Sequence, residues 1–208
     1  TILKMRIKIE PAKNSSLYQI YSPAGFEFSI SAKGIFETGL STEKEIEEAC
    51  LEQARAYAAR EKVLRQAIYY LGFRDYSVGE MLDKLARQGI DGSDAVDQLV
   101  RMGYINDDTY ADRIIEKYGS RYGKRRVAQE LQKRKIDRLI WQEKLEQLQT
   151  DPIAEISQTL QKRVKGLPIE DLREKQKQYA YFLRRGYDGE DIKKAIALYN
   201  ENVKEDVE

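Results

Sequence analysis

Basic residues are concentrated in one short stretch of the sequence, GSRYGKRRVAQELQKRKIDR, which spans residues 119–138. The stretch holds eight basic and two acidic residues, a local net charge of +6, whereas the whole chain carries only +1. If Val127 and Leu131 face a helical core, the Lys-Arg-Arg run at 124–126 lies in the first turn of that helix, where cations oppose the helix dipole. Basic side chains placed against this preference indicate an anionic partner, either a phosphate backbone or an acidic protein surface.

Six basic residues in or beside this expected helix are the predicted contacts to the partner: Arg121, Lys124, Arg125, Arg126, Lys133 and Arg134. The alternative interpretation is a solvated helix face, which charge runs usually form. The net charge of +1 predicts only weak, non-specific attraction to a DNA backbone.

Catalytic and metal-binding patterns are absent from the sequence. There is no histidine, so the commonest general base and the Ser/His and Cys/His nucleophile pairs are missing. There is also no GxxxxGK[ST] or GxGxxG loop for a phosphate. We therefore predict a protein that is not an enzyme and uses no cofactor or metal. A small enzyme that uses carboxylates and a metal remains a third hypothesis.

The cysteine content and hydropathy suggest the cellular compartment. Cys50 is the only cysteine, which excludes an internal disulfide and fits a reducing cytosol. The longest stretch without a charge, residues 14–26, is too short and too polar for a membrane span, and no signal peptide is recognisable. We expect a cytoplasmic protein with no membrane contact.

The elements that position the basic stretch follow from hydrophobic periodicity. Alternating apolar and polar residues predict three short antiparallel strands near 4–10, 17–22 and 26–31, followed by a turn at Lys33-Gly34. Everything after Ser41 has helical spacing, and Ser77-Val-Gly-Glu80 has capping-box spacing at the start of one helix.

One heptapeptide pattern recurs three times, as LARQGID (85–91), LQKRKID (131–137) and FLRRGYD (182–188). The aspartates that close it, Asp91, Asp137 and Asp188, each precede a helix, where a carboxylate can accept hydrogen bonds from free N–H groups. Eight residues beyond each aspartate lies an apolar residue of the next helix, which supports a true repeat. We interpret the aspartates as structural caps.

The repeat predicts a mainly α fold of three tandem three-helix, helix-turn-helix-like units in an elongated curved array after a small antiparallel β segment. The predicted segments are a β extension (1–41), a connecting helix (42–59) and three repeats (60–106, 107–150 and 151–208), of which the second is basic. Two of the three final helices begin with acidic residues, so reading of the DNA major groove by every unit is not expected.

The chain resembles the RecX family of bacterial regulators of the RecA recombinase. The matching stretches are LGFRDYSVGEMLDKLARQGID, MGYINDDTYA at 102–111, RYGKRRVAQELQKRKID and FLRRGYDGEDIKKAI. The N-terminal YQIYS, FEFSIS and TGLSTEKE are similar to the β extension of longer, Gram-positive-type members. One departure is Lys135, where the family usually has a glycine after the second helix, so the geometry of this turn is the open point.

The resemblance implies a non-enzymatic modulator that binds the RecA–DNA filament, most simply as an inhibitor in its groove. Such proteins limit filament growth, ATP hydrolysis, strand exchange and co-protease activity in recombination and SOS repair. The basic residues of the second repeat (107–150) are the expected contacts, and the protein is expected to be a monomer. The alternative is a DNA-binding or architectural protein that acts without RecA.

Overall fold

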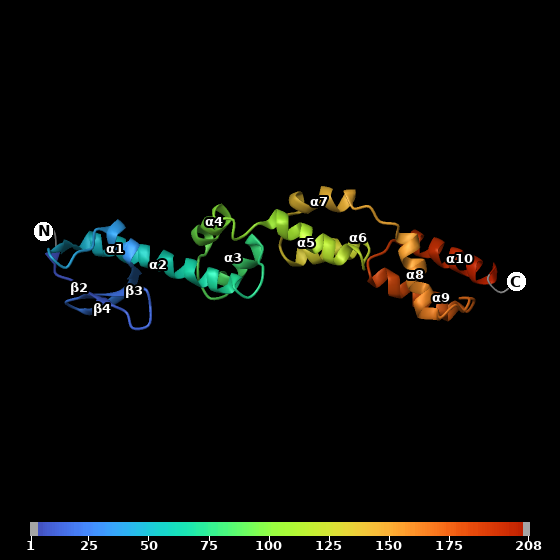
Figure 1. Cartoon of the computed structure of the whole chain (residues 1–208), viewed down its shortest axis with the longest axis horizontal. Coiled ribbons are helices and arrows are strands. Elements are labelled where there is room, and N and C mark those ends of the chain that lie inside the picture. The colour runs from blue at the N-terminus through green and yellow to red at the C-terminus, as the bar shows by residue number, and fades with distance from the viewer. Residues whose placement is uncertain (1–3, 206–208) are drawn as a thin grey trace. The chain divides into compact units, whose positions relative to one another are not determined.

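The computed structural model describes residues 4–205 and is predominantly helical (Figure 1). Within these residues there are ten helices and five short strands, which confirms the mainly α fold with a small antiparallel β segment. The strands are β1 (Lys4–Met5), β2 (Lys8–Pro11), β3 (Leu17–Ser22), β4 (Gly25–Ser31) and β5 (Ile46–Glu47). The helices are α1 (Ala32–Thr38), α2 (Glu48–Leu71), α3 (Val78–Ala86), α4 (Ser93–Arg101), α5 (Asp107–Gly119), α6 (Lys124–Lys133), α7 (Arg138–Gln147), α8 (Pro152–Val164), α9 (Leu172–Arg184) and α10 (Gly189–Glu205).

The strands form two antiparallel sheets rather than one. Strands β2, β3 and β4 are adjacent in that order, whereas β1 pairs with β5 in a separate two-stranded sheet. The single strand predicted at 4–10 is therefore wrong, because the chain changes partner between β1 and β2. Ile7 lies between β1 and β2 and is buried. The alternation of apolar residues therefore arises because both strands face the same core, although they are not one continuous strand.

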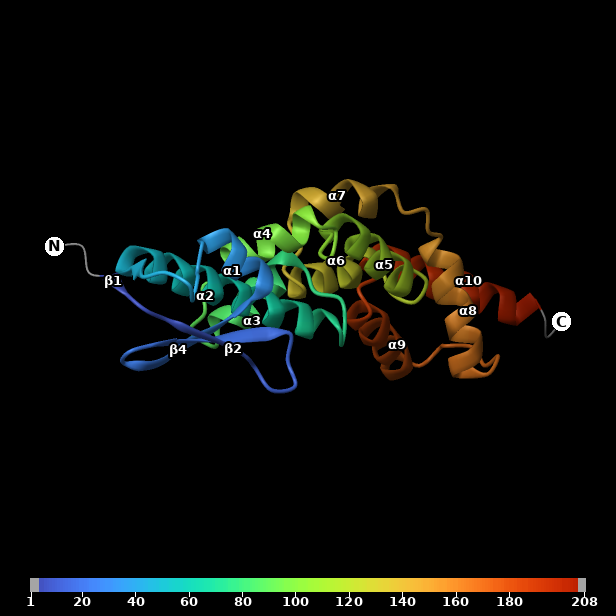
Figure 2. The ribbon, with the colours of Figure 1, turned by 60° about the vertical axis from the view of Figure 1, so that its left-hand side comes forward.

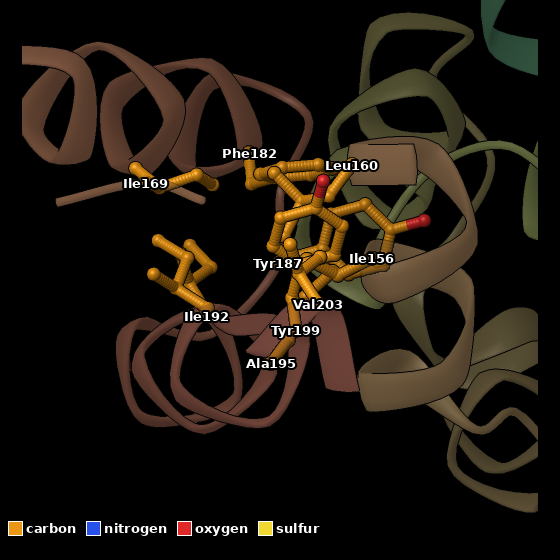
Figure 3. Close-up of a cluster of buried hydrophobic side chains, with 10 residues drawn as sticks. Ile156, Leu160, Ile169, Phe182, Tyr187, Ile192, Ala195, Tyr199 and Val203 are labelled. Carbon is orange, nitrogen blue, oxygen red and sulfur yellow. The ribbon is translucent and has the colours of Figure 1, made fainter. Parts of the chain in front are cut away.

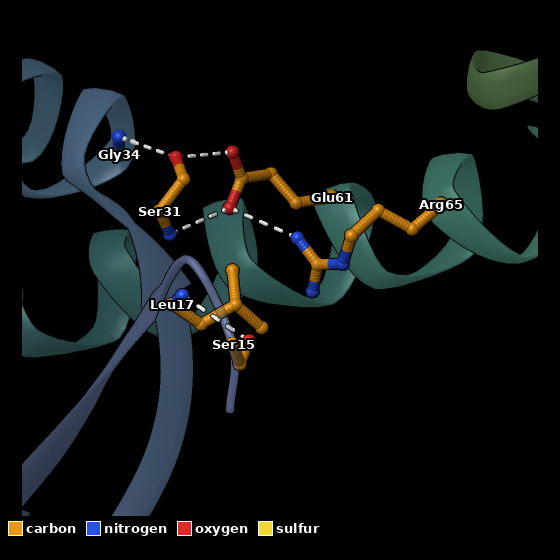
Figure 4. A network of polar contacts seen from close by, with 6 residues as sticks. All are labelled: Ser15, Leu17, Ser31, Gly34, Glu61 and Arg65. Carbon is orange, nitrogen blue, oxygen red and sulfur yellow. Dashed lines mark hydrogen bonds and ion pairs between the residues drawn. The ribbon is translucent and has the colours of Figure 1, made fainter. Parts of the chain in front are cut away.

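The turn predicted at Lys33-Gly34 is also wrong, because both residues lie in α1. Ser31 caps this helix by accepting a hydrogen bond from the Gly34 N–H, and its own N–H and hydroxyl donate to the Glu61 carboxylate of α2 at 3.0 and 2.5 Å (Figure 4). A Cβ built at Gly34 would lie 2.5 Å from Ile30 Cγ1 and 2.8 Å from Tyr57. The glycine is needed for close packing and not for a turn.

Helix α2 is one unbroken helix from Glu48 to Leu71, so it begins later than Ser41 suggested and runs through the predicted boundary at residue 60. Its N-terminal half packs on β4, and the strands extend along one side of it (Figure 2). This core consists of buried side chains from the strands, α2 and the segments between them: Ile7, Ile20, Phe28, Ile30, Leu40, Ile46, Leu51, Ala54 and Ala58. The division of the chain into five segments stays a prediction.

The chain separates into two compact units. One contains Thr1–Asp75 and Met81–Ile105, and the other contains Tyr76–Glu80 and Asn106–Glu208. Helix α3 begins in the second unit and continues in the first. Its predicted capping box is confirmed, because the Glu80 N–H donates to Ser77 Oγ at 3.0 Å and the Ser77 N–H donates to Glu80 Oε2 at 3.3 Å.

Helices α5, α6 and α7 enclose a core of their own in the second unit. Val127 and Leu131 of α6 are fully buried, as the periodicity predicted. They pack with Trp141, whose indole N–H donates to the Ile136 carbonyl at 3.1 Å. This core fixes which face of α6 is turned outward.

Helices α8, α9 and α10 form the last core of the second unit, in which Ile156, Leu160, Phe182 and Tyr199 are almost completely buried (Figure 3). Helix α9 begins at Leu172 and not near Pro168 as predicted. The segment before α9 is not helical and is anchored to α10, because the Asn200 side-chain amide exchanges two hydrogen bonds with the Ile169 backbone, at 2.8 and 3.0 Å.

Two negative findings apply to the part of the chain that the structure describes. No helix within residues 4–205 is long and apolar enough to cross a membrane. The same residues contain no group of three or more Cys, Asp or Glu side chains that could hold a metal ion.

Candidate partner-binding surface and repeat junction

Helix α6 positions the basic residues predicted from the sequence. It begins at Lys124 after Gly123, and no side chain caps its first turn. Because Val127 and Leu131 face the core, the basic residues lie around the remaining circumference of the helix. The six predicted contacts are therefore close in sequence, but they do not point to one common spot.

Four of the six basic side chains already have partners within the second unit. Lys124 Nζ donates to the Glu146 carbonyl at 2.9 Å, and Arg126 pairs with the buried Glu130 at 2.8 Å. Arg125 pairs with Asp188 at 2.6 Å. These partners reduce the number of cations in this stretch that are free to meet an external anion.

Arg134 is the most enclosed of the four. Its guanidinium lies 5.6 Å from the centre of the Tyr110 ring and donates to the Tyr110 hydroxyl at 2.6 Å. Its backbone carbonyl accepts a hydrogen bond from Ser77 Oγ. These contacts make Arg134 a packing residue of the second unit.

Of the six predicted contacts, Arg121 and Lys133 are exposed and make no side-chain hydrogen bond or ion pair within residues 4–205. Arg125 is also exposed, but its side chain is paired with Asp188. Arg121 and Lys133 are therefore the cations of this set that an external anion would meet without displacing a partner in the fold.

The three aspartates of the recurring heptapeptide occupy equivalent positions. Each accepts a hydrogen bond from the backbone N–H two residues further on, at 3.0 Å for Asp91, 2.9 Å for Asp137 and 3.0 Å for Asp188. The N–H and hydroxyl of Ser93 lower the pKa of Asp91 below its usual value. The bonds fix the start of the helix that follows each turn.

The residue two positions before each aspartate has a left-handed backbone in all three copies. The φ angles are +72° at Gly89, +54° at Lys135 and +83° at Gly186. Lys135 therefore keeps the turn geometry of the glycines at a conformational cost of about 1 kcal/mol, because a side chain disfavours this region. The family resemblance left the geometry of the turn at Lys135 open. The φ angles show that this turn has the same backbone conformation as the two turns that contain glycine.

Two of these left-handed residues lie against a glycine at the start of another helix. A Cβ built at Gly79 would lie 2.8 Å from the Lys135 carbonyl oxygen, and one built at Gly123 would lie 2.2 Å from that of Gly186. The preceding carbonyls also accept hydrogen bonds, although from different donors: Arg134 accepts from the Ser77 hydroxyl, and Arg185 accepts from the Gly123 backbone N–H at 3.0 Å. The second unit thus contains two similar close approaches of a glycine to a left-handed turn.

We call the close contact between Gly123 and Gly186 the repeat junction. The sequence did not reveal that Arg185 lies at this junction. Its guanidinium donates to the Arg121 carbonyl at 2.9 Å and lies 4.8 and 5.2 Å from the rings of Tyr122 and Tyr181. Arg163 covers the Tyr181 ring at 3.5 Å. Aromatic rings and guanidinium groups therefore alternate across this region.

A charge count could have found this region. Residues 162–185 contain eight basic and three acidic residues, a balance of +5 that nearly equals the basic stretch at 119–138. The stacking itself has no sequence signal, because Tyr122 and Tyr181 lie 59 positions apart. The second unit therefore has two basic segments that meet at the repeat junction.

A pocket of about 350 Å³ lies beside the repeat junction. Lys124 and Arg125 line it together with Glu155, Asp188 and Asp191, so cations and carboxylates are mixed. The Tyr187 hydroxyl donates to Glu155 at 3.0 Å, and burial, followed by this carboxylate, raises the pKa of Tyr187 well above its usual range. The mixed charge makes this pocket a packing feature and a poor site for a simple anion.

Comparison with known proteins agrees with the fold. The model of a family described as "RecX, third three-helix domain" matches residues 150–196. A solved regulatory protein RecX has a TM-score of 0.69 at 18% identity and covers 92% of this chain and 98% of its own. RecX from Lactobacillus salivarius has a TM-score of 0.56 at 22% identity and covers 68% of this chain and 97% of its own. These structures establish a fold of three-helix repeats.

Curated proteins with similar sequences support the same family assignment independently of the structures. The regulatory protein RecX of Chromobacterium violaceum is 30% identical over 67% of this chain and 93% of its own length. That of Caldanaerobacter subterraneus subsp. tengcongensis is 26% identical over 92% of this chain and 98% of its own. The relatives and the family model together define a non-enzymatic regulatory protein built on three-helix domains. The chain belongs to the RecX family.

Proposed function

We propose that this protein binds the RecA–DNA filament and restrains it, limiting filament growth, ATP hydrolysis, strand exchange and co-protease activity. The observation that carries the proposal is the relationship to RecX regulatory proteins over nearly the whole chain, since the family resemblance implies RecA as the partner. The proposed site of action is the bacterial cytoplasm, and the protein is proposed to act as a monomer.

The geometry of the second unit supports this proposal in two ways. Arg121 and Lys133 present unpaired cations to solvent, which suit an acidic protein surface or a phosphate backbone. The repeat junction holds two repeats together through backbone contacts, so several weak contacts can act jointly and add avidity.

The test is the DNA-dependent ATPase and strand-exchange activity of RecA with sub-stoichiometric protein added. We expect inhibition by the parent and weaker inhibition by the double variant Arg121→Glu/Lys133→Glu. The variant Lys13→Glu/Lys44→Glu is the matched control, because it makes the same charge change at two exposed residues outside the second unit. Charge reversal at Arg125 or Arg126 is a poorer test, since it would also break ion pairs within the fold.

Two results would contradict the proposal at different levels. If the parent binds the filament and changes neither activity, the protein is not a RecA modulator of this kind. If the parent inhibits and both double variants inhibit equally well, RecA modulation stands but Arg121 and Lys133 are not contacts.

The second candidate function is binding to DNA without RecA, and the stacked region at the repeat junction favours it. Tyr122, Arg185, Tyr181 and Arg163 alternate there, and aromatic and guanidinium planes are the groups on which unpaired bases stack. Binding to a bare single strand, with a steep dependence on salt that weakens in Arg163→Gln, would support this candidate. Binding only in the presence of RecA would exclude it.

A further inference from the structure

A groove of about 570 Å³ lies between α9 and α10. Its apolar lining comes from Tyr179, Ile196 and Ala197. The Tyr179 hydroxyl abuts the backbone at Gly189, where an added Cβ would lie 2.6 Å away, so this side of the groove is held in place. Pockets of this size and character accept apolar side chains.

Among the described residues that line the groove, the charged ones are two lysines, Lys175 and Lys193. Lys175 is exposed and makes no ion pair within the described residues. Lys193 pairs with Glu190 at 3.0 Å, but both side chains are mostly exposed, so the pair is weak and easily exchanged.

Two other pockets in the described part of the chain lack this combination. The one beside the repeat junction contains Glu155, Asp188 and Asp191, and one in the first unit contains Glu61, Asp91 and Asp94. Both place carboxylates among cations. The described lining of the groove between α9 and α10 instead combines three apolar or aromatic residues with two amides and two lysines, which is complementary to an apolar group flanked by acids.

We propose that the groove between α9 and α10 binds an amphipathic helical segment of a partner protein that carries acidic residues beside its apolar stripe. Apolar residues spaced three and four apart enter the groove, as in other complexes of a helix in a groove. The flanking carboxylates meet Lys175 and Lys193. This inference goes beyond the proposed function, because it involves none of the six basic residues around α6 and needs neither RecA nor DNA.

The experiment measures binding of a fluorescein-labelled helical peptide, with leucine at positions three and four apart and glutamate elsewhere, to the full chain by anisotropy. We expect saturable binding that becomes at least about tenfold weaker in Ala197→Glu and in Lys175→Glu/Lys193→Glu. Ala197 is exposed on α10 and glutamate favours helix, so the variant should fold, which circular dichroism checks. Lys194→Glu is the control for a single carboxylate added to α10, because Lys194 is exposed on the same helix and does not line the groove.

The competing occupants give different results. A peptide with lysine in place of glutamate should not bind, and a thymidine 20-mer should not displace the glutamate peptide. The proposal is overturned if the glutamate peptide does not bind, if Ala197→Glu binds it like the parent, or if the lysine peptide binds equally well. It is also overturned if the oligonucleotide competes for the groove. Because the assay contains no RecA, these outcomes are independent of the proposed function.

Discussion

Replacing Gly123 with alanine should separate the two repeats that meet at the repeat junction. The new Cβ would lie 2.2 Å from the Gly186 oxygen and 2.6 Å from the Tyr187 nitrogen, so backbones must move apart by more than about 1 Å to reach ordinary contact. The φ of Gly123 is −62°, which alanine adopts readily. The effect should therefore come from the contact and not from strain at residue 123 itself.

The size of the effect follows from the groups that the movement separates. The hydrogen bond from the Gly123 N–H to Arg185 contributes about 1 kcal/mol. Overpacking adds about 1 to 3 kcal/mol, whereas alanine gains back roughly 0.5 kcal/mol by restricting the unfolded chain. The exposed Arg125–Asp188 pair adds little. We expect the free energy of unfolding to fall by about 1.5 to 3.5 kcal/mol.

Urea denaturation with two probes can measure this change. Trp141, the only tryptophan, is buried among α5, α6 and α7, so its fluorescence reports that core, whereas far-ultraviolet circular dichroism reports all helices. In Gly123→Ala we expect the two transitions to separate and amide hydrogen exchange in α9 and α10 to become faster.

A control and a clear negative outcome complete the experiment. Gly72→Ala should change the free energy of unfolding by less than about 0.5 kcal/mol, because its φ is −64° and the nearest atom to a Cβ would be 3.3 Å away. If Gly123→Ala keeps coincident transitions and the stability of the parent, close backbone approach does not hold these repeats together, and the reasoning is wrong.

Three further substitutions test local features. Lys135→Gly should raise the free energy of unfolding by up to about 1 kcal/mol, because glycine removes the cost of the left-handed backbone. The melting temperature should rise with it, and an unchanged or lower melting temperature would contradict this. Ser77→Ala should lower stability by about 1 to 2 kcal/mol in urea denaturation, since it removes the cap of α3 and the bond to Arg134, and an unaltered midpoint would exclude that role. The pKa of Asp91 is lowered in the folded state, so its stabilisation is present above the unfolded pKa of about 3.9 and is lost as pH falls through the folded value. Asp91→Asn should therefore weaken the decline in melting temperature below about pH 4, whereas an identical decline in both proteins would refute the assignment.

The sequence was most informative where periodicity and capping act locally. The buried positions Val127 and Leu131 and the capping box at Ser77 were predicted because each depends on residues within one or two turns. Gly34 was misread because its role is a close approach to Ile30 and Tyr57, which a propensity for turns does not reveal.

The candidate surface stays a prediction, because the contacts that its side chains make within the fold depend on distant residues. Local charge identified the stretch around α6, but it could not show that Arg125 is paired with Asp188, which lies 63 residues away. The sequence shows how many cations a helix carries. Which of them remain free depends on partners brought close by packing, and this leaves Arg121 and Lys133 as the sharper candidates.

The carboxylate of Asp188 bonds to the Glu190 N–H and also to Arg125 of another repeat, whereas that of Asp91 bonds, among the residues the structure describes, to the nearby Ser93 alone. Asparagine and serine cap helices about as well as aspartate, so either residue could replace Asp91 and keep the cap. At position 188 the same replacement would keep the cap but remove the charge that faces Arg125. Averaging the repeats into one consensus would erase this difference, and an engineered array built from such a consensus would keep its caps and lose this ion pair.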